Sequence, residues 1–152
     1  MRVLLPVKRG EKPLAGKGHI VLSTGERDNG ASAVAAKEAK REAVTWGKRA
    51  AWCDYYGPVD GKIVGFAIMD HPRNPRHPTW WHVRDYGLFA ANPFGQHDFE
   101  GLKDKTAGDF KIAAGQSATF RYRVVIHEGD EKAADIAGRF AEYAKTPVTN
   151  IK

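Results

Sequence analysis

The side chains with the most chemistry lie between residues 70 and 85, in the run DHPRNPRHPTWWHVRD. Three histidines stand there with two tryptophans and two aspartates. Imidazole gains or loses a proton near neutral pH, so it serves as a general acid or base. An indole ring covers the C–H face of a sugar, while polar side chains hydrogen-bond its hydroxyl groups. This combination predicts a site that binds or processes a carbohydrate.

The expected catalytic residues are His71 and His82, which would exchange protons, together with a carboxylate. Asp70 and Asp85 are the nearby carboxylates, and we assign the role to Asp85 although no spacing fixes which one acts. The candidate substrate-binding residues, which supply a stacking ring or hydrogen bonds, are Asn74, His77, Trp80, Arg84, Asn92 and His127. The reaction class stays open among epimerase-, lyase- and hydrolase-like chemistry.

Two alternatives come from other classes of protein. His71, His77 and His82 are ligand types that suit copper, iron or zinc. No HExxH-type spacing is present, so we assign no metal and no other cofactor. The second alternative is a non-catalytic structural or assembly module, in which His82→Ala changes stability but no ligand response.

The elements around these residues are expected to hold them in two arrays. Prolines at every third position, 72, 75 and 78, predict a polyproline II ribbon. That ribbon would carry His71, Asn74 and His77 on one edge. A strand over residues 79–85 would place residues 80, 82 and 84 on one face and residues 81, 83 and 85 on the other. Trp81 is then expected in the core.

The remaining pattern predicts a mainly-β fold: an antiparallel β-sandwich with one C-terminal α-helix, in a single domain over residues 1–152. Strands are expected in RVLLPV and GHIVLST, on both sides of GPVDG, on both sides of Gly87, and over residues 117–127. The run after GPVDG is apolar on both faces, which indicates a central strand. Residues 91–110 read as loop. The helix is expected between an Asp130 cap and Lys145, with an apolar stripe of Ala133, Ile136, Ala137, Phe140 and Ala144.

Composition excludes several classes. The net charge of +6 lies wholly in residues 1–52, with 11 Lys and Arg against 5 Asp and Glu. These charges form no basic run, so we expect no nucleic-acid partner. The early apolar run is interrupted by Pro6 and is too short to cross a membrane. Residues 31–44, rich in Ala, Lys and Glu, predict an exposed helix or a mobile insertion.

The single cysteine, Cys53, excludes an internal disulfide and a cysteine-based zinc cluster. We expect it to be a packed thiol rather than a nucleophile. A cytoplasmic location is expected, and a periplasmic one is also consistent with this cysteine count.

The segment GFAIMDHPRNPRHPTWWHVRDYGLFAANPFG, followed by FRYRVVIHEGD and a terminal helix, resembles a known family. This is the bacterial family labelled PmoA-like or "methane oxygenase", also catalogued as a domain of unknown function (DUF6807-type). WGKRAAWCDYYGPVDGKIVG fits the family's hairpin, and the likeness runs from about residue 46 to residue 145. The resemblance implies a relationship to galactose-mutarotase-like β-sandwiches, whose members bind or modify carbohydrates.

The family's chains are usually longer, with a further N-terminal β region. The resemblance therefore implies that this chain is a short form or a C-terminal half. An incomplete sandwich exposes sheet surface and edges, so we expect a homo-oligomer.

Overall fold

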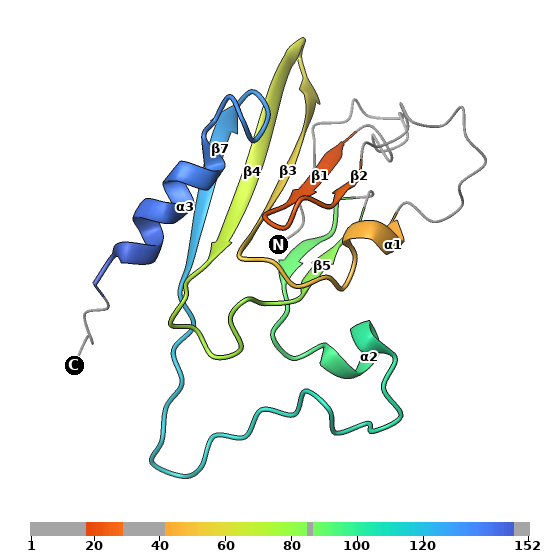
Figure 1. Ribbon diagram of the computed structural model, residues 1–152, viewed down its shortest axis with the longest axis vertical. Coiled ribbons are helices and arrows are strands. Elements are labelled where there is room, and N and C mark those ends of the chain that lie inside the picture. Colours follow the sequence, from red (N-terminus) through yellow and green to blue (C-terminus); the bar gives the residue numbers. More distant parts are fainter. Residues whose placement is uncertain (1–17, 29–41, 85–86, 148–152) are drawn as a thin grey trace.

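The computed structural model describes residues 18–28, 42–84 and 87–147. Its main element is a five-stranded antiparallel sheet with the order β2-β1-β3-β4-β7 (Figure 1). These strands are β1 (His19–Leu22), β2 (Arg27–Asp28), β3 (Trp52–Val59), β4 (Lys62–Asp70) and β7 (Tyr122–Glu128). The expected strand within GHIVLST is confirmed, and β4 lies inside the sheet, between β3 and β7.

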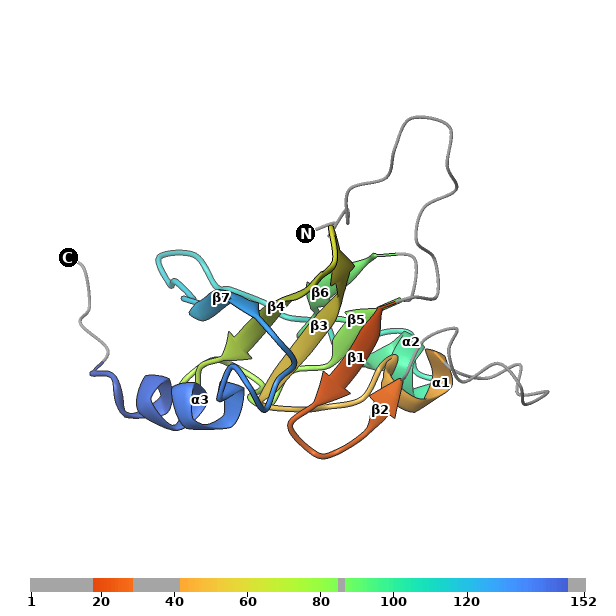
Figure 2. The same cartoon turned by 90° about the horizontal axis from the view of Figure 1, so that it is seen from above.

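Two further layers cover the main sheet, one on each face (Figure 2). One layer is a two-stranded antiparallel sheet of β5 (Trp81–Val83) and β6 (Phe89–Ala91). The other is the helix α3 (Ile136–Lys145). The predicted mainly-β fold with antiparallel sheets and a C-terminal helix is confirmed.

The hairpin of β3 and β4 turns at Asp60 and Gly61, whose φ angles are 48° and 81°. Positive φ at both central residues is the geometry of a two-residue hairpin turn that matches strand twist. Pro58 lies within β3, beyond the last residue that pairs with β1, which is Tyr56. Its missing N–H therefore costs no bond to β1.

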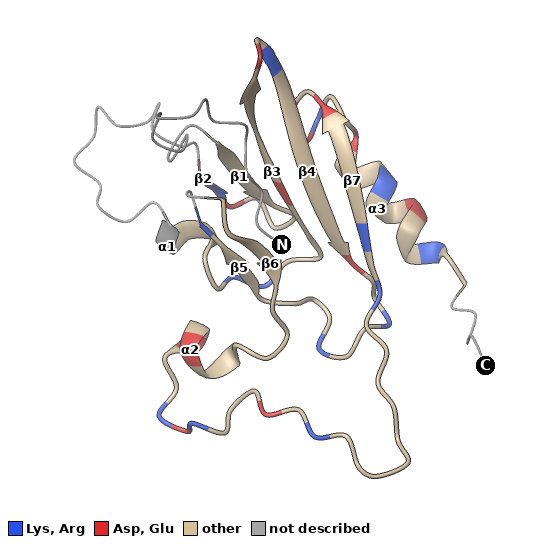
Figure 3. Ribbon diagram, turned by 180° about the vertical axis from the view of Figure 1, so that it is seen from behind, with Lys and Arg blue, Asp and Glu red and all other residues tan. Residues whose placement is uncertain are grey.

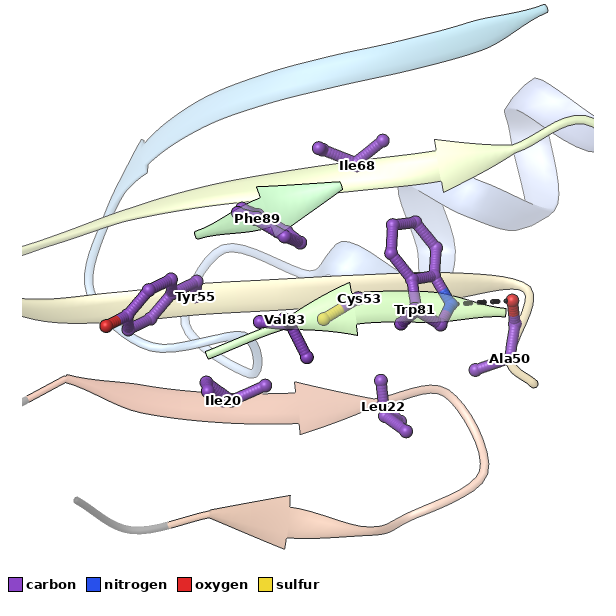
Figure 4. Close-up of a cluster of buried hydrophobic side chains, with 9 residues drawn as sticks. All are labelled: Ile20, Leu22, Ala50, Cys53, Tyr55, Ile68, Trp81, Val83 and Phe89. Carbon is purple, nitrogen blue, oxygen red and sulfur yellow. Dashed lines mark hydrogen bonds between the residues drawn. The ribbon is translucent and has the colours of Figure 1, made fainter. Parts of the chain in front are cut away.

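Strand alternation divides the core in two. Ile20, Cys53, Tyr55 and Ile68 face the small sheet, where they meet a second set of buried residues (Figure 4). That set includes Trp81, Val83 and Phe89, and the indole Nε1 of Trp81 donates to the Ala50 carbonyl at 2.9 Å. The expected core position of Trp81 is confirmed, and the Cys53 thiol is fully buried.

The opposite face of the sheet packs against α3 through Val21, Trp52, Ala67 and Met69. The helix begins at Ile136, and the Asp135 carboxylate accepts from the Gly138 amide at 3.2 Å. The prediction that Asp130 caps this helix is wrong. Asp130 instead accepts from the Lys132 and Ala133 amides of the preceding turn.

The expected apolar stripe of α3 is correct only in part. Ile136 is buried and Phe140 packs against the core, whereas Ala133 and Ala137 are exposed. Ala134 and Tyr143 are buried instead. Asp135 is in the left-handed region, with a φ of 49°, so the residues before it do not continue the helical repeat that begins at Ile136.

The polyproline II prediction for residues 71–78 is wrong. The Asn74 amide donates to the His71 carbonyl at 2.8 Å, and the His77 amide donates to the Asn74 carbonyl at 3.2 Å. The segment is thus two successive turns, with prolines at the second position of each, where their fixed φ is favourable. The loop prediction for residues 91–110 also missed the short helix α2 (Gln96–Glu100), which ends at Gly101 in the left-handed region.

Two predicted elements fall largely outside the described residues: the strand at RVLLPV and the helix or insertion at 31–44. Of the latter region the structure describes the helix α1 (Glu42–Thr45). Within the described ranges, no helix has the length and apolar character needed to cross a membrane. Basic and acidic residues are intermixed along the described elements (Figure 3).

Candidate functional site

The buried carboxylate of Asp70 organises the loop that follows β4. Asn74 Nδ2 donates to Asp70 Oδ1 at 2.7 Å, and the Thr79 amide donates to Asp70 Oδ2 at 3.0 Å. His77 Nδ1 lies 2.8 Å from the same Oδ2. Asn74 also bridges to β7, because it bonds both the carbonyl and the amide of Arg121, at 2.6 and 2.7 Å. These contacts join two segments that lie 47 residues apart in the chain.

The two histidines of this loop face α3. The His71 ring meets Tyr143 edge-on at 5.0 Å, and the His77 ring stacks over Phe140 at 6.5 Å. His71 is 1% exposed, and its Nδ1 accepts from the Arg73 amide at 3.1 Å. His71 Nε2 therefore carries the ring proton, and this buried atom has no hydrogen-bond partner among the described residues.

The predicted strand face of residues 80, 82 and 84 is formed by β5 and its flanks. His82 lies edge-on to Trp46 and Phe99, with ring centroids at 6.2 and 5.7 Å. Arg84 lies 4.7 Å above the Trp46 ring. Burial, followed by the charge of Arg84, lowers the pKa of His82, so the imidazole is more readily neutral.

Trp80 lies on the same face but is only 3% exposed. The guanidinium of Arg49 lies 4.3 Å above the Trp80 ring, and the indole Nε1 of Trp80 donates to Glu100 Oε1 at 3.0 Å. The Arg49 guanidinium therefore covers one face of the Trp80 ring. The expected stacking of Trp80 on a sugar stays a prediction.

The structure divides the predicted site residues among three places. His71, Asn74 and His77 lie in the loop against α3, whereas Trp80, His82 and Arg84 lie on the outer face of the small sheet. His127 lies on the α3 side of β7, about 20 Å along the strand from the His71 loop. Asn92 closes a local turn by accepting from the Phe94 amide at 3.0 Å. Asp85 lies outside the described residues.

This division bears on the metal alternative. His82 is separated by the main sheet from His71 and His77, so these three imidazoles do not converge. In the ranges that the structure describes, no three His, Cys, Asp or Glu side chains form a group that could hold a metal ion.

Among the described residues, the most deeply buried titratable pair is Asp54 with His127. His127 Nε2 lies 2.9 Å from Asp54 Oδ1, and Asp54 is fully buried. The two residues sit on β3 and β7, on either side of β4, where His127 pairs with Gly65 and Asp54 pairs with Ala67. Burial raises the pKa of Asp54 to about 6, against the opposing effect of its hydrogen bond to His127. The pair can therefore hold or release a proton near neutral pH.

Further polar groups surround this pair, and we call the whole set the Asp54 cluster. The set comprises Asp54, His127, Tyr56, His19, Arg27 and Glu131. The His19 and Tyr56 rings stack at 5.0 Å, and Arg27 donates to Glu131 Oε1. Burial, followed by the charge of Glu131, raises the pKa of Tyr56.

Three buried atoms of the cluster lack a hydrogen-bond partner within the described structure: Asp54 Oδ2, Glu131 Oε2 and His19 Nδ1. Buried polar atoms are ordinarily paired, so such atoms mark a place where water or a ligand supplies the missing contacts. The two carboxylate oxygens require donors. The cluster opens to solvent at Arg27, whose side chain is 35% exposed.

Sequence reasoning included His127 but missed Asp54 and the rest of the cluster. Trp52, Asp54 and Tyr56 alternate on one face of β3, so a charged residue at the middle of an otherwise apolar strand was the available signal. Its partner lies 73 residues away in the chain.

Comparison with curated proteins and with solved structures finds no match to this chain. The sequence profile described as "Family of unknown function (DUF6807)" matches residues 8–141. The match covers most of the sequence, including every strand of both sheets and the Asp54 cluster. The chain therefore belongs to this family of unknown function.

Proposed function

We propose that the protein binds a carbohydrate at the Asp54 cluster and that the Asp54–His127 pair exchanges protons with the bound sugar. The observation that carries the proposal is the buried carboxyl group, with a pKa of about 6, hydrogen-bonded to an imidazole. A general acid or base works best when its pKa lies near the operating pH.

The unpartnered atoms support a hydroxyl-rich ligand. Asp54 Oδ2 and Glu131 Oε2 are acceptors that need donors, and each hydroxyl of a sugar supplies one. The half-buried Tyr56 and His19 rings and the partly exposed Arg27 are the groups that such a ligand would meet first. The resemblance to galactose-mutarotase-like sandwiches favours the same ligand class, by analogy.

The simplest reaction for such a pair is interconversion of sugar anomers. Asp54, as carboxylate, takes the proton of the anomeric hydroxyl, while His127 gives a proton to the ring oxygen. The bond between the anomeric carbon and the ring oxygen breaks, and reversal of the same transfers closes the other anomer. Neither an oxidant nor a second substrate is needed.

The test combines binding with rate. Saturation-transfer NMR with D-galactose, D-glucose and their uronic acids is expected to show binding to at least one sugar. Polarimetry on freshly dissolved α-anomer is expected to show acceleration that falls roughly 100-fold or more in Asp54→Asn and His127→Gln, in the usual range for acid–base groups.

A matched control is His97→Gln, at a histidine of α2 that pairs with Asp98 outside the cluster. This variant is expected to keep both binding and rate. If no sugar binds, the ligand class is wrong. If sugars bind but Asp54→Asn keeps the full rate, the assignment of the proton-exchanging pair is wrong.

A further inference from the structure

Within the part of the chain that the structure describes, β7 is an edge strand. Among the described strands it pairs only with β4, over seven successive residues without a bulge. The His71 amide bonds the Arg121 carbonyl at 3.2 Å, and the Gly129 amide bonds the Ile63 carbonyl at 2.8 Å. Hydrogen-bonded pairs alternate along an antiparallel ladder, so the odd-numbered residues of β7 bond to β4. The backbone groups of the even-numbered residues point away from the sheet.

The side chains of the same even-numbered residues form an uncovered apolar strip. Val124 is 49% exposed and Ile126 is 68% exposed. They lie beside Ile68 and Phe66 of β4, on the face that the small sheet covers elsewhere. The buried cluster between the two sheets includes neither Val124 nor Ile126. An apolar edge strand of this kind is a template for pairing with another strand.

The strand is complementary to itself in one register. When two copies run antiparallel about Val125, Val124 of each copy faces Ile126 of the other. At both ends Tyr122 faces Glu128, which places a phenol donor opposite a carboxylate. A shift of two residues in one direction sets Val124 against Glu128, and in the other direction sets Ile126 against Tyr122. Only the central register joins the apolar side chains and matches the polar ones.

We propose that this edge binds a second copy of the chain, with β7 antiparallel to β7 in the register centred on Val125. The two five-stranded sheets then form one continuous sheet. Since odd-numbered residues face the α3 side, this register also places Arg123 of one copy opposite His127 of the other.

The first test is the mass of the full chain in solution by light scattering after size exclusion. At roughly 100 µM, a concentration suited to associations of modest affinity, we expect twice the chain mass of 16.8 kDa. Ile126→Lys is expected to yield the single-chain mass, because lysine at a strand edge opposes pairing. The control Ile112→Lys, at another apolar residue that is 53% exposed, is expected to leave the dimer intact.

The second test reads the register. Val125→Cys places two thiols directly across the axis in a non-hydrogen-bonded pair, with about 4.5 Å between Cα atoms, a separation at which disulfides form. Val124→Cys, although more exposed, faces Ile126 and not itself. We expect mild oxidation to cross-link Val125→Cys much faster than Val124→Cys, while the buried native Cys53 stays reduced.

Three outcomes would overturn the proposal: a single-chain mass for the unmodified protein, a dimer that survives Ile126→Lys, or faster cross-linking of Val124→Cys. Circular dichroism verifies that each variant is folded. We expect Ile126→Lys to fold, because the side chain of Ile126 is exposed. If no sugar binds in the NMR experiment, the expected mass, the effect of Ile126→Lys and the order of cross-linking stay the same. Failure of the proposed function and failure of this interface are therefore distinguishable.

Discussion

At the scale of single residues, burial determines the proton chemistry of the Asp54 cluster. Asp54 occupies a fully buried position in β3, where a charged carboxylate is costly. Its hydrogen bond to His127 recovers part of that cost but leaves the pKa of Asp54 at about 6, against 3.8 for the unperturbed group. The same desolvation, with the charge of Asp54 second, raises the pKa of Cys53, which makes that thiol a poor nucleophile.

The raised pKa of Asp54 predicts a specific dependence of stability on pH. Folding favours the protonated carboxyl, so its contribution is fully present below pH 3.8 and is lost as the pH rises through about 6. Asp54→Asn does not titrate. As the pH rises from about 4.5 to about 7.5, the parent protein loses this contribution and the variant does not. We therefore expect the free energy of unfolding of the variant, relative to that of the parent, to increase by roughly 2 kcal/mol over this range. Urea denaturation at the two pH values measures this, and an unchanged difference would contradict the raised pKa.

Gly65 is expected to hold the His127 ring in place. A Cβ at this position would lie 2.3 Å from His127 Cε1, 2.5 Å from Nε2 and 2.9 Å from the Tyr56 Cβ. We expect Gly65→Ala to lower the free energy of unfolding by about 1–3 kcal/mol, as overpacking does, and to shift the His127 ring signals in NMR spectra.

A double-mutant cycle supplies the control for Gly65. In a His127→Ala background the ring is gone, so most of the cost of Gly65→Ala should disappear. An equal cost in both backgrounds would mean that the backbone, and not the imidazole, requires glycine there.

At the scale of elements, polar side chains fix the loop between β4 and β5 onto the start of β7. Asp70, at the end of β4, receives the Asn74 side chain and the Thr79 amide, while Asn74 also bonds both backbone groups of Arg121. These hydrogen bonds anchor the loop, although it contains only turns. The anchored loop places the His71 and His77 rings against Tyr143 and Phe140 of α3, which is a structural role for these two imidazoles.

Removal of the Asn74 side chain tests this anchor. Asn74→Ala leaves one oxygen of the buried Asp70 carboxylate and the Arg121 amide without their partners, each of which costs about 1–3 kcal/mol before relaxation. The Arg121 carbonyl keeps its bond from the His71 amide. We expect a loss of roughly 3 kcal/mol in the free energy of unfolding by chemical denaturation. The exposed neighbour Arg73→Ala is the control and is expected to change little. Equal effects of the two substitutions would argue against the anchor.

At the scale of the whole molecule, the two outer layers pack against opposite faces of one main sheet. The cluster toward the small sheet and the cluster toward α3 both depend on β1, β3 and β4, because alternate residues of the same strands enter each cluster. Neither outer layer has a hydrophobic core of its own. Loss of the central sheet therefore exposes both apolar clusters together.

Unfolding is accordingly expected to be a single transition. Trp81 reports on the cluster toward the small sheet and Trp52 on the cluster toward α3. Denaturation curves from tryptophan fluorescence and from far-UV circular dichroism should have coincident midpoints, as for a two-state domain. Separate midpoints would mean that one layer unfolds independently of the main sheet.

The sequence by itself located the strands β1, β3, β4, β5 and β6 and the C-terminal helix. It did not indicate β2, and β7 begins at Tyr122 rather than at residue 117. Alternation in β4 and β5, the Asp60-Gly61 turn and the alanine-rich periodicity near residue 140 are local signals, and local signals are readable from spacing. Turn chemistry was less readable, because Pro72 and Pro75 suit both an extended ribbon and the second position of a turn.

Only the tertiary structure decided which side chains meet. Trp80, His82 and Arg84 share a face as predicted, yet the main sheet separates them from His71 and His77. Asp54 and His127 become partners because β4 places their two strands on either side of Gly65, where the missing side chain leaves room for the ring. Strand order, and the burial that shifts a pKa, depend on contacts between segments far apart in the chain. The spacing of residues does not predict these contacts.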